Sequence, residues 1–256
     1  GDETRKWGED SFNNNSSYFK CTNRGKSSFV ANFKKKNELE MVQHLAKNAD
    51  IIIENYKVNN LKEYKLDYKN IKKINKSIIY CSITGFGQNG PLALLPGYDF
   101  VIQAMAGIMS ITGEKYGPPI KPGVAYADIF TSLYSVIAIQ AALHSRKKTG
   151  IGSFIDMSLY DTQLAVLANQ ASTYLLNGKE PKRMGNKHPS IVPYQLFEAK
   201  DGDIIIACGN DQQFKSLCNA FEWDFANSKK FSTNKKRIKN RIELISELSN
   251  KLKKFK

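Results

Sequence analysis

Asp128 is the residue whose type and position most suggest chemistry. It is the only charged residue between Pro122 and Ser145, inside the most apolar stretch of the chain. Because it follows a Pro-Gly pair, we expect it in the first turn of a buried helix, where a carboxylate is costly unless something compensates its charge. Two interpretations are equally compatible with this position. The carboxylate caps the helix N-terminus, or it stays ionised there and acts as a nucleophile toward an activated acyl group.

Gly85, Gly87 and Gly90 spell a GxGxxG pattern after an apolar run. In a dinucleotide site the third glycine opens a long helix whose N-terminus meets the pyrophosphate. Here Pro91 follows the third glycine at once. Such a site also needs an acidic residue about twenty positions past the motif to bind a ribose hydroxyl. This chain has none there, and the nearest is Glu114. The pattern therefore predicts a tight turn that lines a substrate, not a nicotinamide site.

Two further polar groups stand beside glycines. Gly97 precedes Tyr98 and Asp99, which could simply cap the helix that follows, and residues 185–189 place His188 in a Pro/Gly loop, where it could simply be exposed. Neither group decides a function alone.

The composition bounds the class of protein. The chain has 256 residues, 41% of them hydrophobic and 24% charged, which suits one domain or one and part of another and excludes a disordered chain. Its first residues lack the apolar run of a secretory signal, so we expect none. Four cysteines without a CxxC pair and three widely spaced histidines predict free thiols, no metal site and a cytoplasmic location, or the mitochondrial matrix in a eukaryote.

The net charge of +14 raises the question of nucleic acid, but +9 of it lies in residues 226–256. We interpret that segment as an amphipathic helix with solvated lysines, and we expect no nucleic-acid and no membrane partner. A basic module that binds RNA or anionic membrane is the alternative. The predicted apolar face comprises Ile238, Ile242, Ile245, Leu248, Leu252 and Phe255.

Short strand and helix patterns alternate along the first 160 residues, which predicts an α/β fold with a Rossmann-like parallel sheet. Strands are expected at 28–33, 50–56, 77–84 and 154–158, the second one covered on both faces. Helices are expected at 38–48, 68–76, 99–110, 125–145 and from 159 to about 176. A second unit then begins with a strand at 203–208 and a helix at 212–221.

The texture changes around residues 181–193, which are rich in Pro, Gly and basic side chains. We therefore expect a large Rossmann-like α/β domain at 1–188 and the start of a smaller α/β domain at 189–256. Both ends look abrupt, so we expect a piece of a longer protein.

Several segments together resemble the class III CoA-transferases, also called the CaiB/BaiF family. The order and spacing of these segments carry the resemblance through nearly the whole chain. They are GDETRKWG (1–8), NRGKS (23–27), IENY (53–56), YCSITGFGQNGP (80–91), GYDF (97–100), GVAYAD (123–128), KTGIG (148–152) and HPSIVPY (188–194). Residues 191–197 and 209–214 are most similar to the succinate–hydroxymethylglutarate, or dicarboxylate, branch.

The resemblance implies a Rossmann-like CoA-binding domain, a smaller second domain and an interlocked homodimer. It also implies that a strand and helix precede Gly1 and that a long segment follows Lys256 and completes the large domain. An inactive, incompletely folded piece is therefore a further possibility.

The resemblance further implies the reaction and its residues. Asp128 falls at the position of the family nucleophile, which moves CoA from an acyl-CoA donor such as succinyl-CoA to a small carboxylic acid through a covalent aspartyl intermediate. CoA contacts fall on Asn32, Phe33 and Lys34, on Asn55, Tyr56 and Lys57, and on Tyr98. Coenzyme A is a substrate here, and no prosthetic group is implied.

Two departures from the family bear on this expectation. Many members carry an arginine for the CoA phosphate where this chain offers only Lys62 or Lys65. The racemase branch has histidine where this chain has Tyr98, and a phenol with a pKa of about 10 replaces it poorly as an acid or base at neutral pH. Tyr98 therefore favours CoA transfer over the alternative within the family, 2-methylacyl-CoA racemisation.

Overall fold

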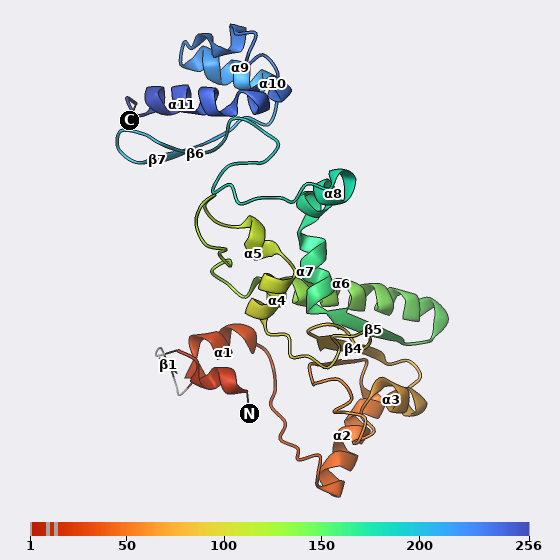
Figure 1. Cartoon of the computed structure of the whole chain (residues 1–256). Coiled ribbons are helices and arrows are strands. Elements are labelled where there is room, and N and C mark those ends of the chain that lie inside the picture. The colour runs from red at the N-terminus through yellow and green to blue at the C-terminus, as the bar shows by residue number, and fades with distance from the viewer. Residues whose placement is uncertain (1, 9–10, 13–14, 256) are drawn as a thin grey trace.

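The structure, a computed structural model, describes residues 2–8, 11–12 and 15–255 (Figure 1). Gly1 and Lys256, the outer ends of the predicted segments, lie outside the described residues. The chain has a mixed α/β architecture, as predicted, and the largest of its sheets is parallel.

The parallel sheet has three strands in the order β3-β4-β5. They are β3 (Ile51–Glu54), β4 (Ile79–Thr84) and β5 (Ser153–Ser158). Three of the predicted strands are therefore confirmed; β3 and β4 are shorter than expected, and β5 begins one residue earlier. β4 is the central strand and is nearly fully buried. The prediction that the β3 segment is covered on both faces is wrong, because Ile53 in the middle of this strand is 59% exposed.

Helices cover both faces of this sheet, and β4 shows how. Tyr80 packs with α2 (Lys36–Asn48) and α3 (Tyr68–Ile74) on one face. Its neighbours Ile79 and Cys81 point the other way, to Ile139 and Ala142 of α6 (Tyr126–Thr149). Alternate residues of a strand face opposite sides, so β4 joins two apolar cores.

α6 forms where predicted, but the expectation that it is buried is wrong. One face packs on β4 and β5, while Leu133, Val136 and Ile137 are more than half exposed. Its length and composition alone would allow it to cross a membrane, a test that a core helix of a soluble protein also passes. Gly150, in the left-handed conformation at φ 70°, ends it.

Two predicted helices are each divided in two. The first becomes α4 (Asp99–Met105) and α5 (Ile108–Ile111), separated by Gly107 at φ 94°. The second becomes α7 (Leu159–Val166) and α8 (Ala168–Asn177), where Ala168 has φ 47°. Apolar periodicity continues across such breaks, so it does not reveal them.

The strand predicted at 28–33 is wrong. This segment is extended but pairs with no strand in the described part of the chain, and Val30 is 88% exposed. The N-terminal region instead forms a 3-10 turn η1 (Glu3–Lys6), the short strands β1 (Ser11–Phe12) and β2 (Asn15–Ser16), and α1 (Ser17–Thr22).

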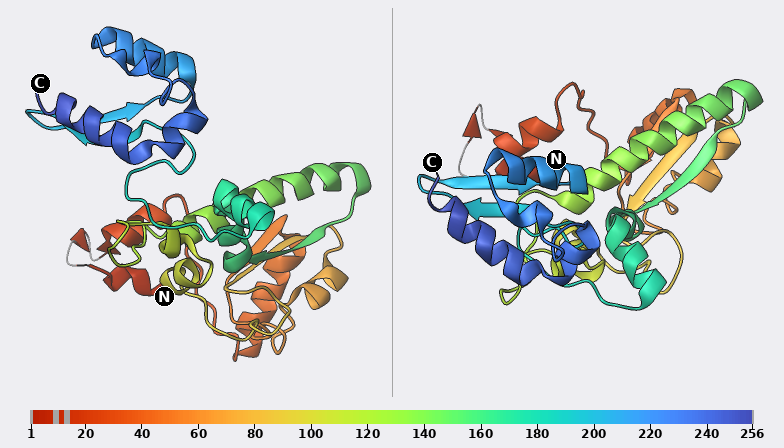
Figure 2. Two further views of the ribbon diagram at one scale, coloured as in Figure 1. Left: turned by 45° about the horizontal axis from the view of Figure 1, so that its top comes forward. Right: turned by 90° about the horizontal axis from the view of Figure 1, so that it is seen from above.

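The C-terminal residues build a separate hydrophobic cluster that joins the rest through a segment without regular structure (Figure 2). An antiparallel hairpin of β6 (Tyr194–Glu198) and β7 (Asp203–Ala207) packs beside helices. The strand at 203–208 is confirmed, whereas β6 was missed. The helices are α9 (Asp211–Ala220), η2 (Asp224–Asn227), α10 (Asn234–Lys239) and α11 (Arg241–Leu252).

The apolar face predicted for the last segment is partly wrong. The helix is interrupted at Asn240, so the register changes, and Leu244, Leu248 and Leu252 face the core. Ile242, which was placed on the buried face, is 88% exposed.

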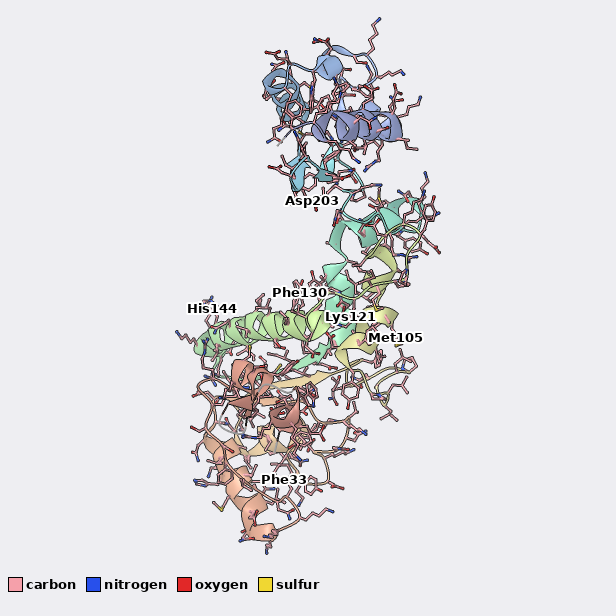
Figure 3. The ribbon with its side chains drawn as sticks, turned by 90° about the vertical axis from the view of Figure 1, so that its left-hand side faces the viewer. Phe33, Met105, Lys121, Phe130, His144 and Asp203 are labelled. Carbon is pink, nitrogen blue, oxygen red and sulfur yellow. The ribbon has the colours of Figure 1, made fainter. Side chains whose placement is uncertain are left out.

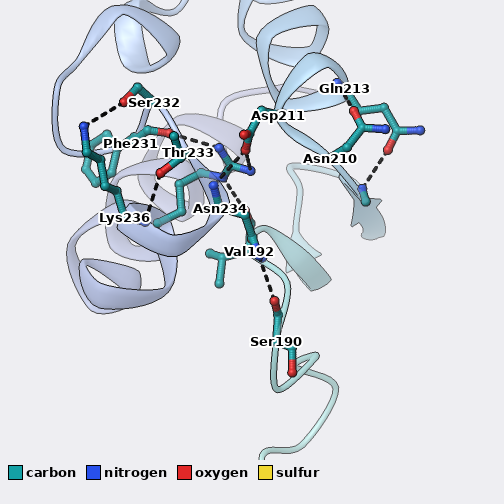
Figure 4. Close-up of polar contacts among 12 residues, drawn as sticks. Ser190, Val192, Asn210, Asp211, Gln213, Phe231, Ser232, Thr233, Asn234 and Lys236 are labelled. Carbon is teal, nitrogen blue, oxygen red and sulfur yellow. Dashed lines mark hydrogen bonds and ion pairs between the residues drawn. The ribbon is translucent and has the colours of Figure 1, made fainter. Parts of the chain in front are cut away.

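One basic residue of this segment lies inside the cluster. The Arg237 guanidinium is fully buried and donates to the Val192 carbonyl at 2.6 Å, the Phe231 carbonyl at 3.0 Å and Asp211 Oδ1 at 2.8 Å. Asn234 connects α10 to the segment that precedes β6, because its side-chain amide donates to the Ser190 carbonyl (Figure 4). The positive charge of Arg237 therefore lies inside the C-terminal cluster and stabilises its fold; it is not part of the basic surface.

Candidate active site

A cavity of about 550 Å³ opens at the carboxyl ends of β3 and β4. Its wall combines residues 55–58 after β3, residues 83–85 at the end of β4, the loop 93–99 and the first turn of α6 with Asp128. Ligands of open α/β sheets bind at this edge. A larger cavity of about 840 Å³ lies between α5, α7 and α8. We place the site in the smaller one because Asp128 lies there with Asn55, Tyr56, Lys57 and Tyr98.

Asp128 presents a free carboxylate to this cavity. Within the described residues its side-chain oxygens make no hydrogen bond or ion pair, so Asp128 does not cap its own helix. Burial and, to a lesser extent, the neighbouring Asp99 carboxylate together raise the pKa of Asp128 to about 6. The negative charge of this carboxylate is therefore held at a cost in free energy.

Asp99 provides the cap that Asp128 does not. Its Oδ1 accepts the backbone N–H of Ala127 at 2.8 Å and that of Asp128 at 3.3 Å. Its Oδ2 accepts from the Gln103 amide at 2.7 Å. The suggestion that Tyr98 and Asp99 cap the helix that follows them is wrong for α4, because no side-chain cap is formed there and Asp99 reaches across to α6.

Asn55, Tyr56, Lys57 and Tyr98 lie in the wall of the same cavity, as a shared ligand requires. The Asn55 amide donates to the Ile83 carbonyl at 2.7 Å, which joins the loop after β3 to β4 and leaves its Oδ1 available. Tyr98 is 75% exposed, so its phenol has room to contact a ligand.

The other three predicted contacts line an adjoining cavity of about 630 Å³. Asn32, Phe33 and Lys34 form a turn there, in which Asn32 Oδ1 accepts the Lys34 N–H at 3.0 Å. Tyr56 belongs to both cavities, and its ring centre lies 6.3 Å from that of Phe33. The predicted residues are thus divided between two adjoining cavities that meet at Tyr56. Phe33 lies in the part of the molecule far from Asp203 (Figure 3).

Lys57 also lines a third, smaller cavity of about 300 Å³ together with Lys62. Lys62 rather than Lys65 is therefore the lysine that shares a cavity with a predicted CoA contact. Glu54 and Asp67 line the same cavity and bring negative charge to it.

The glycine-rich segment forms a turn without a following helix, as predicted. Gly85 and Gly97 touch backbone to backbone, since a Cβ built on Gly85 would lie 2.6 Å from the Gly97 Cα atom. This contact brings the end of β4 against the start of α4, and both glycines line the Asp128 cavity. The turn therefore shapes the site.

Several cavity residues were not predicted. Trp7 and Tyr18 come from the N-terminal region, with ring centres 5.2 Å apart, and burial raises the pKa of Tyr18, as do the nearby Asp128 and Asp99 charges. Thr131 and Ser132 follow Asp128 on α6. Trp7 lies in a segment that resembles the family, which was the one available signal. Tyr18 is more than one hundred residues from Asp128 in sequence, and no local pattern connects them.

Two predicted loops contribute differently. His188 is half-buried, its Nδ1 accepts the Ser190 N–H, and its ring lies 5.1 Å from Tyr194. Among the residues described as lining the Asp128 cavity, none comes from 185–189 or from 209–214. In the latter segment Asn210 caps α9 and Asp211 binds Arg237, so the structure gives these two residues a role in holding the fold.

Comparison with known proteins places this arrangement. The sequence model of the family described as CoA-transferase family III matches residues 1–255. The chain belongs to this family. A solved structure has the same fold. The crystal structure of a CaiB/BaiF family protein from Brucella suis is 50% identical in sequence to this chain, with a TM-score of 0.84, and the match covers 100% of this chain and 69% of that one.

Two curated relatives within this family are named for a reaction. Succinate–glutarate CoA-transferase of Agrobacterium fabrum is 48% identical over 97% of this chain and 64% of its own length. Succinyl-CoA:glutarate CoA-transferase of Homo sapiens is 44% identical over 97% of this chain and 57% of its own length. This chain thus spans about three fifths of the length of these relatives.

Proposed function

We propose that this chain carries the nucleophile and the CoA contacts of a CoA-transferase that moves CoA from succinyl-CoA to a dicarboxylic acid. The observation that carries the proposal is the unpaired Asp128 carboxylate in a cavity at the carboxyl ends of parallel strands. Relatives named for succinyl-CoA and glutarate support the choice of donor and acceptor class.

The proposed reaction runs through Asp128. Its carboxylate attacks the thioester carbonyl, the C–S bond breaks, and CoA leaves as a thiolate from a mixed succinyl-aspartyl anhydride. The thiolate then attacks the aspartyl carbonyl, which releases succinate and leaves an aspartyl-CoA thioester. The acceptor carboxylate attacks this thioester, and the same steps in reverse give the new acyl-CoA and regenerate Asp128. A carboxylate suits this exchange because it leaves as readily as it attacks.

The two adjoining cavities fit an elongated ligand. We place the thioester end beside Asp128 and Tyr98, and the nucleotide end beside Asn32, Phe33 and Lys34, with Tyr56 between them. Lys34 and Lys57 offer ammonium groups to phosphates, as lysines commonly do. The Phe33 and Tyr64 rings, 5.4 Å apart, offer apolar surface to an adenine.

Exchange of label tests the proposal. Carbon-labelled succinate and unlabelled succinyl-CoA are incubated with the protein, and label in the thioester is measured. We expect label to appear, and we expect Asp128→Ala to abolish it. Absence of exchange with every dicarboxylate tried, on a folded protein, would overturn the proposal.

One observation favours a second candidate, a 2-methylacyl-CoA racemase. A carboxyl with a pKa of about 6 suits a general base near neutral pH. A racemase also needs an acid on the opposite face, and Tyr98 is a poor one. Deuterium uptake from D₂O at the α-carbon of a 2-methylacyl-CoA would support this candidate, and its absence beside active exchange would exclude it.

The finer architecture and assembly belong to the same proposal. We assign residues 1–188 to a Rossmann-like CoA-binding domain and residues 189–256 to a second domain, supported by the separate cluster around Phe214 and Leu248. The protein forms an interlocked homodimer, supported by the exposed apolar face of α6. It is cytoplasmic, or in the matrix of mitochondria, and needs no prosthetic group, metal, nucleic acid or membrane.

A further inference from the structure

Asp99 holds the helix that carries the nucleophile, although it belongs to another helix. It is the first residue of α4, and its Oδ1 accepts two successive backbone N–H groups from the first turn of α6, at 2.8 and 3.3 Å. The second of these is the N–H of Asp128 itself. The orientation of that first turn, and with it the direction in which Asp128 points, therefore depends on Asp99.

Gln103 fixes Asp99 in this position. It lies one turn further along α4 and is fully buried, and its amide donates to Asp99 Oδ2 at 2.7 Å. Its Oε1 has no partner among the described residues. Both Asp99 oxygens are thus occupied, so this carboxylate cannot turn away from α6 without leaving buried donors unpaired.

The charge of Asp99 is not needed for these hydrogen bonds. A neutral amide oxygen would cap the two N–H groups as well, since asparagine is as good a helix cap as aspartate. Yet a second carboxylate beside a nucleophilic one opposes its ionisation. The negative charge of Asp99 therefore destabilises the ionised form of Asp128. A residue that only capped the helix would not need this charge.

We propose that Asp99 is a positioning residue for Asp128, which orients the first turn of α6 through two hydrogen bonds and keeps a negative charge beside the nucleophile. The consequence for catalysis rests on the proposed function, whereas the effect on Asp128 does not.

Among the groups that face Asp128, Asp99 is the one whose negative charge raises the Asp128 pKa. Tyr18 from α1, Tyr98 before α4 and Lys57 after β3 line the same cavity, and Asp99 is the charged neighbour that raises the Asp128 pKa after burial itself. With a pKa of about 6, Asp128 is still about nine-tenths ionised at pH 7. The charge of Asp99 thus makes the carboxylate more basic, and a better nucleophile, without neutralising it.

Asp99→Asn separates the two roles. The asparagine oxygen still accepts from Ala127 and Asp128, and its new NH₂ group faces Gln103. The Gln103 amide can turn over and offer the Oε1 that now has no partner, so the hydrogen bonds are retained and only the charge is lost. Asp99→Ala removes both the hydrogen bonds and the charge.

The test is a carbon NMR titration of protein labelled at aspartate Cγ, with Asp128→Asn to assign the Asp128 signal. We expect the Asp128 pKa to fall from about 6 toward its ordinary value of 3.8 in Asp99→Asn, without reaching it because burial remains. The matched control is Asp161→Asn, a first-turn aspartate of α7 that lines neither cavity and should leave Asp128 unchanged. An unchanged Asp128 titration in Asp99→Asn would overturn the proposal.

The rate at which succinyl-CoA acylates the protein gives the second readout. A fall of one unit in this pKa would raise the ionised fraction at pH 5 about fivefold, so we expect Asp99→Asn to react faster than wild type at pH 5 and slower at pH 8. Asp99→Ala should be slower at every pH. A shifted titration without any acylation would contradict the proposed function alone, and acylation with the wild-type pH profile in Asp99→Asn would contradict the role of Asp99 alone.

Discussion

The nucleophile is held at a cost to stability. Its ordinary pKa is 3.8 and its folded value about 6, so the folded protein resists ionisation of Asp128. The destabilisation is absent below about pH 4, grows as the pH rises to 6, and is constant above that.

We therefore expect Asp128→Asn to raise the free energy of unfolding at pH 7 to 8. The full shift would correspond to about 3 kcal/mol, but solvent reaches this carboxylate, so we expect about 1 kcal/mol. Urea unfolding at several pH values measures this gain. A gain that persists undiminished at pH 4 would show that the cost is not electrostatic.

The contact of Gly85 with Gly97 gives a second expectation at this scale. Gly85→Ala would place Cβ 2.6 Å from the Gly97 Cα atom, and neither backbone can move without displacing the cavity wall. We expect a loss of about 2 kcal/mol or more in stability and weaker binding of CoA. The control is Gly123→Ala, where a Cβ meets nothing within 4 Å. Equal stability of the two variants in thermal melts would refute the role of the contact.

At the scale of elements, Arg237 is the anchor of the C-terminal cluster. Replacing it by methionine removes three hydrogen bonds from a fully buried position and leaves Asp211 without its ion-pair partner. We expect a loss of about 3 kcal/mol.

Lys253→Met serves as the control for this variant. Its ion pair with Glu198, at 2.8 Å, lies between side chains that are both more than half exposed. Loss of such a pair costs at most about 1 kcal/mol. If both variants unfold at the same temperature, Arg237 is not the anchor.

Most elements could be predicted because their signals are local. The apolar runs of β4 and β5 and the capped pattern of α9 specify structure within a few residues. β6 was missed because its inward positions are Gln195 and Phe197, so a polar residue hides the alternation. The prediction of a strand at 28–33 is wrong because a strand needs a partner, and this segment pairs with no strand among the described residues, which no local sequence pattern reveals.

The candidate site was predictable only in part, for the same reason. Resemblance to the family placed Asp128 and the residues around Tyr56, and the structure brings them to adjoining cavities. The resemblance did not predict that Tyr18 lines this cavity, nor that Asp99 of α4 accepts hydrogen bonds from the first turn of α6. These relations depend on how distant segments pack, which a local pattern does not encode.

At the scale of the whole molecule, α6 leaves several large apolar side chains exposed along one face. Leu133, Val136 and Ile137 point away from the sheet. If the proposed homodimer covers them, Ile137→Glu should convert a dimer to a monomer in sedimentation velocity. Ile205→Glu, on the exposed side of β7, should leave the dimer intact. A wild-type protein that sediments as a monomer would contradict the proposed assembly.

The covalent role of Asp128 is tested most directly by intact mass. The protein is incubated with succinyl-CoA, and its mass is measured before and after treatment with alkaline hydroxylamine, beside Asp128→Ala. We predict an added mass that corresponds to an acyl group or CoA, that hydroxylamine removes, and that the variant lacks. An adduct that forms equally on Asp128→Ala, or a folded protein that exchanges label without any labile adduct, would contradict the aspartyl route.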